Sequence, residues 1–65
     1  MIIMVREWKD YNGENAYYIL YESGRTYYRF GENRLPAPAR KFIREHIPAR
    51  LYNPYFGRWE NNYRA

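Results

Sequence analysis

The absence of cysteine most tightly constrains what this 65-residue chain can fold into. A chain of this length forms one small domain, residues 1–65, and ordering it costs on the order of 100 kcal/mol, which buried apolar surface must offset. Small domains often add disulfides or a metal, but no cysteine and a single histidine leave neither staple available. Large aromatic rings are the remaining resource, so the nine tyrosines indicate first of all a core built from rings.

Two Gly-containing turns predict a three-stranded antiparallel β-meander over about residues 2–9, 16–22 and 25–30. Asn12-Gly13 is typical of a two-residue hairpin turn. Ser23-Gly24 is a second candidate for such a turn.

The length of these turns decides which side chains share a face of the sheet. With two residues in each turn, Trp8 pairs with Tyr17, and Tyr17 pairs with Phe30. Side chains alternate across a strand, so Tyr18 and Tyr27 are expected on the opposite, outer face. We expect the face that carries Trp8 and Tyr17 to be the one that a helix covers.

An α-helix is predicted over about residues 38–47. An apolar stripe at helical spacing supports it: Ala39, Phe42, Ile43, His46 and Ile47. Pro38 suits the first helical position, and Pro48 ends the helix. His46 lies on the apolar stripe, so we interpret it as a packed or capping histidine rather than a catalytic one.

The order of a meander followed by a helix resembles KTSC-type small domains. The resemblance rests on Ser23-Gly24 followed by Tyr27-Tyr28-Arg29-Phe30. After Phe30 the chain departs from that family in length and composition, so the resemblance implies no function.

The C-terminal segment 51–63 is rich in aromatic residues and has no clear periodicity. Asn53-Pro54 predicts a turn. Residues 58–60 either add a short strand or belong to a coil that wraps the core. The predicted fold class is therefore α+β: a three-stranded antiparallel β-meander packed by one α-helix, with an aromatic C-terminal segment.

The charge of the chain is concentrated in its C-terminal half. Residues 1–32 carry four basic and five acidic groups, a net charge of −1, whereas residues 33–65 carry seven basic and two acidic groups, a net charge of +5. Such asymmetry favours an anionic partner, with nucleic acid the first candidate. Nine arginines against two lysines are also compatible with a thermophilic source.

Catalysis, metal binding and cofactor binding are not expected. One serine and no cysteine leave almost no material for a nucleophile with an adjacent base, and the seven carboxylates are scattered along the chain. The longest apolar run, Met1–Val5, is too short for a membrane span or a signal peptide. We therefore expect a cytoplasmic protein with no membrane partner.

The first candidate binding surface is a basic ridge on the predicted helix. Arg40, Lys41 and Arg44 form this ridge, with Arg34 and Arg50 flanking it. A row of cations on a rigid element gains affinity for nucleic acid by releasing counterions from the phosphates. The alternative is an ordinary solvated helix face.

The second candidate surface is the outer sheet face. Tyr18 and Tyr27 are expected there beside Arg25 and Arg29. Tyrosine rings stack on unpaired bases while guanidinium groups hold phosphates. The alternatives are that residues 51–59 cover this face, or that a homodimer forms through it.

Two functions follow from these surfaces. The first is a small non-enzymatic nucleic-acid-binding module that uses the helix ridge and the outer sheet face. The second is a protein-interaction module, such as a phage or mobile-element inhibitor or adaptor, because Tyr, Trp and Arg dominate binding hot spots.

Overall fold

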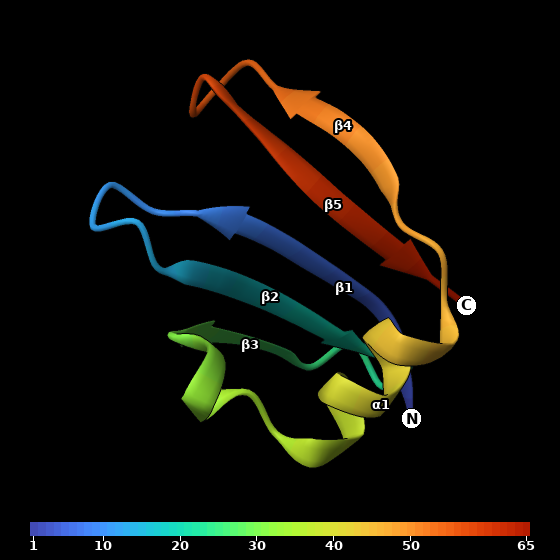
Figure 1. Ribbon diagram of the computed structural model, residues 1–65. Coiled ribbons are helices and arrows are strands. Elements are labelled where there is room, and N and C mark those ends of the chain that lie inside the picture. The colour runs from blue at the N-terminus through green and yellow to red at the C-terminus, as the bar shows by residue number, and fades with distance from the viewer.

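The sheet has five strands, which overturns the predicted three-stranded meander. The computed structural model describes residues 1–65. Its strands are β1 (Ile2–Lys9), β2 (Asn15–Tyr21), β3 (Thr26–Phe30), β4 (Ala49–Asn53) and β5 (Arg58–Arg64). They are antiparallel in the order β3-β2-β1-β5-β4, so the first and last strands pair at the centre (Figure 1). The C-terminal segment thus forms a hairpin that extends the sheet and does not wrap the core.

Both of the first two turns hold three residues, where two were predicted. The amide of Asp10 donates to the carbonyl of Glu14 at 2.9 Å, and that of Tyr21 donates to the carbonyl of Arg25 at 2.9 Å. Gly13 and Gly24 close the two turns at φ 79° and 91°, and no other residue type has positive φ. A two-residue type I′ turn needs positive φ at both positions, so each turn instead takes a third residue and a glycine bulge.

The extra residue in each turn moves β1 and β3 by one position relative to β2. Tyr17 therefore pairs with Glu7 and Arg29, whereas Trp8 pairs with Ala16. A slip of one residue transfers every side chain of a strand to the other face. The predicted pairs of Tyr17 with Trp8 and Phe30 are wrong for this reason.

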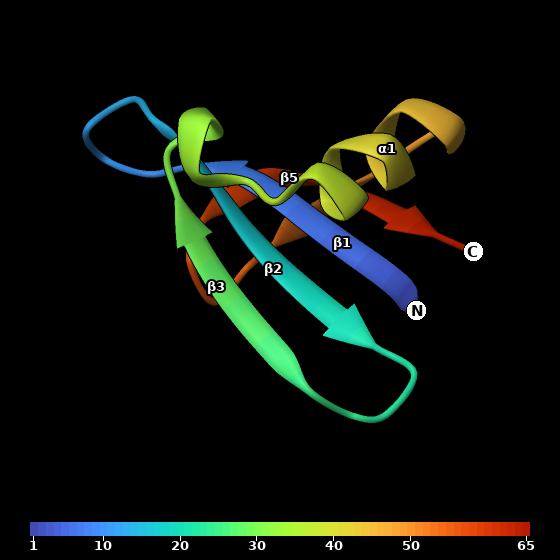
Figure 2. The same ribbon diagram turned by 90° about the horizontal axis from the view of Figure 1, so that it is seen from below.

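One face of the sheet is covered by the single α-helix, α1 (Ala37–Glu45), which follows the short 3-10 helix η1 (Glu32–Arg34) (Figure 2). Ala39 and Phe42 are buried, as the apolar stripe predicts. The helix ends at Glu45, earlier than expected, because His46 is already extended at φ −124° and ψ 145°. Ile47, the last member of the stripe, is 95% exposed.

His46 packs and caps as we interpreted it from the sequence. Its ring stacks on Phe42 with 4.1 Å between centroids, and its Nδ1 donates to the Phe42 carbonyl at 2.7 Å. This bond satisfies one of the carbonyls that a helix end leaves without a partner.

The core lies between α1 and the covered face of the sheet. Its buried members are Ile2, Val5, Tyr17, Ile19, Leu35, Ala39, Phe42 and Tyr63. A register shift between Ile2 and Met4 returns Ile2 to the face of Val5. Tyr17 is 1% exposed at the centre, so a tyrosine does serve as a core builder.

Tyr17 should make the stability of the fold sensitive to alkaline pH. Burial raises the pKa of Tyr17 to about 12 from an ordinary value of 10.0. A raised pKa means that the folded state favours the neutral phenol, so its contribution is fully present below pH 10.0 and is lost as the pH rises through about 12. Urea unfolding measures the free energy of unfolding at each pH. Between pH 10 and 12, we expect this free energy to fall on the order of 2 kcal/mol less for Tyr17→Phe than for the unmodified protein. Tyr52→Phe, at a half-exposed position, is the control, and equal pH dependence of all three proteins would contradict the assignment.

Candidate nucleic-acid interface

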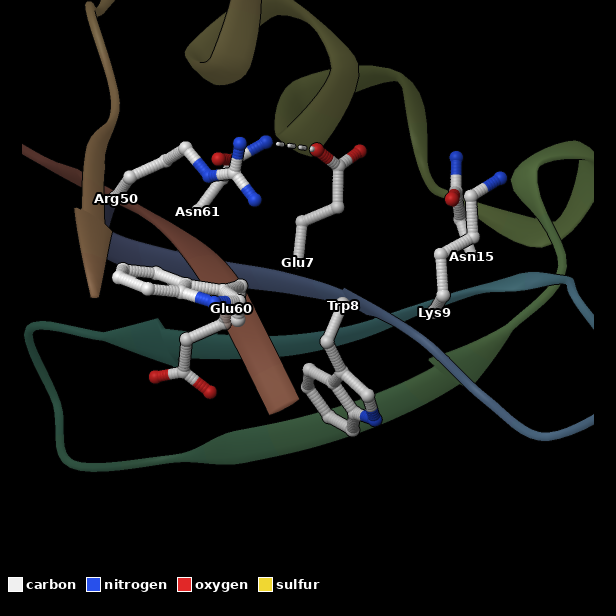
Figure 3. Close-up of a pocket in the computed structure, with 8 residues that line it drawn as sticks. Glu7, Trp8, Lys9, Asn15, Arg50, Glu60 and Asn61 are labelled. Atoms are coloured by element: carbon white, nitrogen blue, oxygen red, sulfur yellow. Dashed lines mark hydrogen bonds between the residues drawn. The ribbon is translucent and has the colours of Figure 1, made fainter. Parts of the chain in front are cut away.

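The sheet has a second face, opposite α1, that no other element covers. Because side chains alternate, neighbouring residues of one strand point to opposite faces. Figure 3 shows this at the centre of the sheet, where Trp8 and Glu60 point away from Glu7, Asn61 and Arg50. We call the side of Trp8 and Glu60 the open face.

Aromatic side chains gather on the open face. Trp8, Tyr18, Tyr28 and Phe30 come from β1, β2 and β3, and Phe56 joins them from the turn between β4 and β5. Tyr28, Phe30 and Phe56 are 56%, 54% and 59% exposed, and Tyr18 meets Tyr28 edge to face at 5.2 Å. We call these five residues the aromatic patch. A cluster of exposed aromatic side chains is typical of a binding site.

An ion pair lies at the centre of the aromatic patch. Arg6 donates from Nε to Glu60 Oε1 at 2.9 Å and from Nη2 to Glu60 Oε2 at 3.0 Å. Its guanidinium lies over the Tyr18 ring, 5.5 Å from the centroid. The hydrogen bonds that Arg6 donates to Glu60 raise the pKa of Arg6 above its ordinary value, although burial acts in the opposite direction. A hollow of about 70 Å³ adjoins the pair and is lined by Arg6, Trp8, Tyr18, Tyr28, Phe56 and Glu60.

The other predicted members of the outer face lie on the opposite side of the sheet from Tyr18. Tyr27 packs against the core, and a groove of about 630 Å³ along β3 holds it together with Arg25 and Arg29. The Arg29 guanidinium lies 5.2 Å from the centroid of the Tyr27 ring. The prediction that Tyr18 and Tyr27 share one face is wrong, because the longer turn shifts β3 by one residue.

The helix ridge exists, but it also lies on the far side of the sheet from the aromatic patch. Arg40, Lys41 and Arg44 are exposed on α1, and Lys41 forms an ion pair with Glu45 at 3.9 Å. The two residues predicted to flank the ridge belong to other elements. Arg34 lies in η1, and Arg50 lies on β4, where its guanidinium carbon is 5.4 Å from the centroid of the Trp59 ring. The ridge and the aromatic patch are therefore two separate candidate surfaces.

A polar pocket of about 470 Å³ was not foreseen from the sequence. It opens beside the helix on the covered side of the sheet, where Glu7, Asn61 and Arg50 converge and Lys9 and Asn15 form a second group (Figure 3). Glu7 Oε1 accepts hydrogen bonds from Asn61 Nδ2 and from the Tyr63 hydroxyl, both at 3.2 Å. Burial raises the pKa of Tyr63, and the Glu7 carboxylate adds to this effect. The Glu7 carboxylate at the centre of the pocket is therefore already bound by hydrogen-bond donors of this chain.

One polar side chain on the open face has a buried oxygen without a hydrogen-bond partner. Asn62 is 7% exposed, and its Oδ1 is buried with no hydrogen-bond partner. A buried acceptor without a donor costs free energy. We therefore expect Asn62→Val to keep or raise the free energy of unfolding, by up to about 1 kcal/mol.

The neighbouring residue provides a matched control for Asn62→Val. Asn61 donates to Glu7, so Asn61→Val should lower the free energy of unfolding by about 1 kcal/mol. Thermal and urea unfolding of both variants measure the difference. A loss at Asn62 as large as that at Asn61 would show that the Asn62 amide is satisfied after all.

No group of three His, Cys, Asp or Glu side chains is placed to hold a metal ion. The one α-helix, of nine residues, has neither the length nor the apolar character needed to cross a membrane. Comparison of the chain with protein-family models, with curated proteins and with solved structures finds no match.

Proposed function

We propose that the protein is a non-enzymatic module that binds single-stranded nucleic acid on its aromatic patch. The exposure of Tyr28, Phe30 and Phe56 on the open face is the observation that carries this proposal. A solvated sheet face does not need three rings that are each more than half exposed. Unpaired bases supply the flat apolar surface that such rings stack against.

The charge of the chain supports an anionic polymer as the ligand. The net charge of +4 attracts nucleic acid from a distance. Arg64 is exposed, and it lies on the open face because it pairs with Met4, which shares that face with Arg6 on β1. Arg25 and Arg29 lie on the covered side of the sheet, next to the edge strand β3. A strand whose bases stack on the open face would bring its phosphates toward Arg64, and toward Arg25 and Arg29 only where it passes over the edge of β3.

A single strand fits this surface better than a duplex does. In a duplex the faces of the bases are stacked on each other, so rings of a protein surface have no access to them. Titration of labelled single-stranded and double-stranded oligonucleotides at two salt concentrations tests the proposal. We expect tighter binding of the single strand, weakened by salt. The absence of salt-sensitive binding near micromolar protein would refute it.

Removal of one exposed ring should weaken binding by the free energy that one stacked base contributes. We expect Tyr28→Ala to reduce single-strand affinity roughly 5- to 150-fold, since each stacked base contributes about 1–3 kcal/mol. Tyr52→Ala is the matched control, because Tyr52 is 51% exposed, against 56% for Tyr28, and belongs to the other face of the sheet. Fluorescence anisotropy of the labelled strand measures both variants. Equal losses would mean that the aromatic patch is not the interface.

The helix ridge offers the sharpest competing interface. Replacing Arg40, Lys41 and Arg44 with Gln removes three exposed charges. If the ridge acts only through the long-range field, the resulting loss of affinity should shrink markedly between low and high salt. The loss caused by Tyr28→Ala should persist at both. A ridge variant that abolishes binding while Tyr28→Ala has no effect would place the nucleic acid on α1.

A protein partner is the second candidate function. Phe30 and Leu51 are 54% and 47% exposed on the open face, and neither has a polar atom with which to bind a phosphate or a base edge. Such residues also suit the apolar centre of a protein interface. Sedimentation of the protein alone and pull-down after nuclease treatment distinguish the cases: self-association or a stoichiometric partner that survives nuclease favours this candidate.

A further inference from the structure

Arg6 is presented to the open face with part of its hydrogen-bonding capacity unused. Its Nε and one hydrogen of Nη2 are taken by Glu60 at 2.9 and 3.0 Å. A guanidinium has five N–H groups in one plane. The outer edge of Arg6, formed by Nη1 and the second hydrogen of Nη2, makes no hydrogen bond within the protein. Its side chain is 29% exposed, against 9% for Glu60.

The carboxylate of Glu60 disfavours an anionic ligand at this edge. The ion pair is neutral as a unit, and a phosphate or carboxylate on Arg6 would lie close to the negative charge of Glu60. A neutral group with two adjacent acceptors meets no such repulsion. The aromatic side chains around the pair also favour a planar, uncharged ligand.

The size of the hollow limits how far such a ligand enters. Its volume of about 70 Å³ corresponds to the share of roughly two water molecules in the liquid. This space admits the edge of a base and not the whole ring system. The rest of the base would lie on Tyr28, which lines the hollow and is 56% exposed.

We infer that Arg6, held in position by Glu60, recognises guanine in the bound strand. This inference rests on the proposed function and specifies the base at the centre of the aromatic patch. Guanine offers O6 and N7 as two adjacent acceptors, which match the two parallel N–H groups of an arginine edge. Adenine places an amino group beside N7, and thymine places a methyl group beside O4, so neither pairs in this way. Unpaired cytosine, with O2 and N3, is the competing base.

The test uses 15-mer single strands of thymidine that carry one central guanine, adenine, cytosine or thymine. A single guanine avoids the self-association of guanine runs. We expect the guanine strand to bind about tenfold more tightly than the other three. A strand with 7-deazaguanine, in which a C–H replaces N7, should lose most of this advantage.

Two variants separate recognition from general affinity. Arg6→Lys keeps the charge but loses the planar pair of donors, so affinity for the guanine strand should fall by more than affinity for the thymidine strand, until the guanine preference disappears. Glu60 acts as a positioning residue: Glu60→Gln removes a negative charge and releases Arg6, so thymidine binding should strengthen while the preference for guanine falls. A merely structural role for Glu60 would move both affinities in the same direction. Circular dichroism checks that both variants are folded.

The outcomes distinguish the inference from the function on which it rests. Failure to bind any of the strands would overturn both. Equal affinity for all four bases, a preference for cytosine, or an undiminished preference for 7-deazaguanine would overturn guanine recognition and leave the single-strand module standing. Preference for guanine that Arg6→Lys abolishes supports the assignment.

Discussion

Two glycines set the register on which every face of this protein depends. Gly13 and Gly24 each close a three-residue turn at positive φ, where other residues are strained. The turns hold β1 and β3 on either side of β2 so that Val5, Tyr17 and Tyr27 meet beneath the helix. The same turns send Trp8, Tyr18 and Tyr28 to the opposite side. Core and binding surface are thus two results of one backbone constraint.

The Arg6–Glu60 pair serves both the fold and the proposed recognition. It joins β1 to β5, two strands that are distant in sequence and central in the sheet. Burying charges is costly unless they are paired, so each partner strongly disfavours loss of the other. A pair that the folded sheet already holds in place reaches the ligand oriented, which spares the entropy of ordering a long side chain on binding.

Local signals in the sequence predict part of this structure. The helix stripe of Ala39 and Phe42 and the position of Tyr18 away from Tyr17 follow from side-chain periodicity, which a chain with so few elements cannot easily override. The predicted strand register is wrong because Asn12-Gly13 suits a two-residue turn as well as a three-residue turn that ends in glycine. Strand β4 is not predicted from the sequence because it is exposed almost throughout. Strand β5 is predicted only as one of two alternatives, over residues 58–60, because it alternates Trp59, Glu60 and Asn61 without an apolar pattern. The pairing of β5 with β1 is non-local, and neither segment alone contains a signal for the Arg6–Glu60 contact that joins them.

The pairing of the first and last strands also has a consequence for how the chain acquires its structure. β1 lies in the middle of the sheet, yet one of its two edges stays unpaired until residues 58–64 have been synthesised. Contacts of such high sequence separation slow folding, because a long loop must close before they form. During synthesis the early meander exposes the backbone of β1 and the rings of Trp8 and Tyr18 to other chains. For this protein, the period of greatest risk of misassembly is the interval between emergence of β3 and arrival of β5.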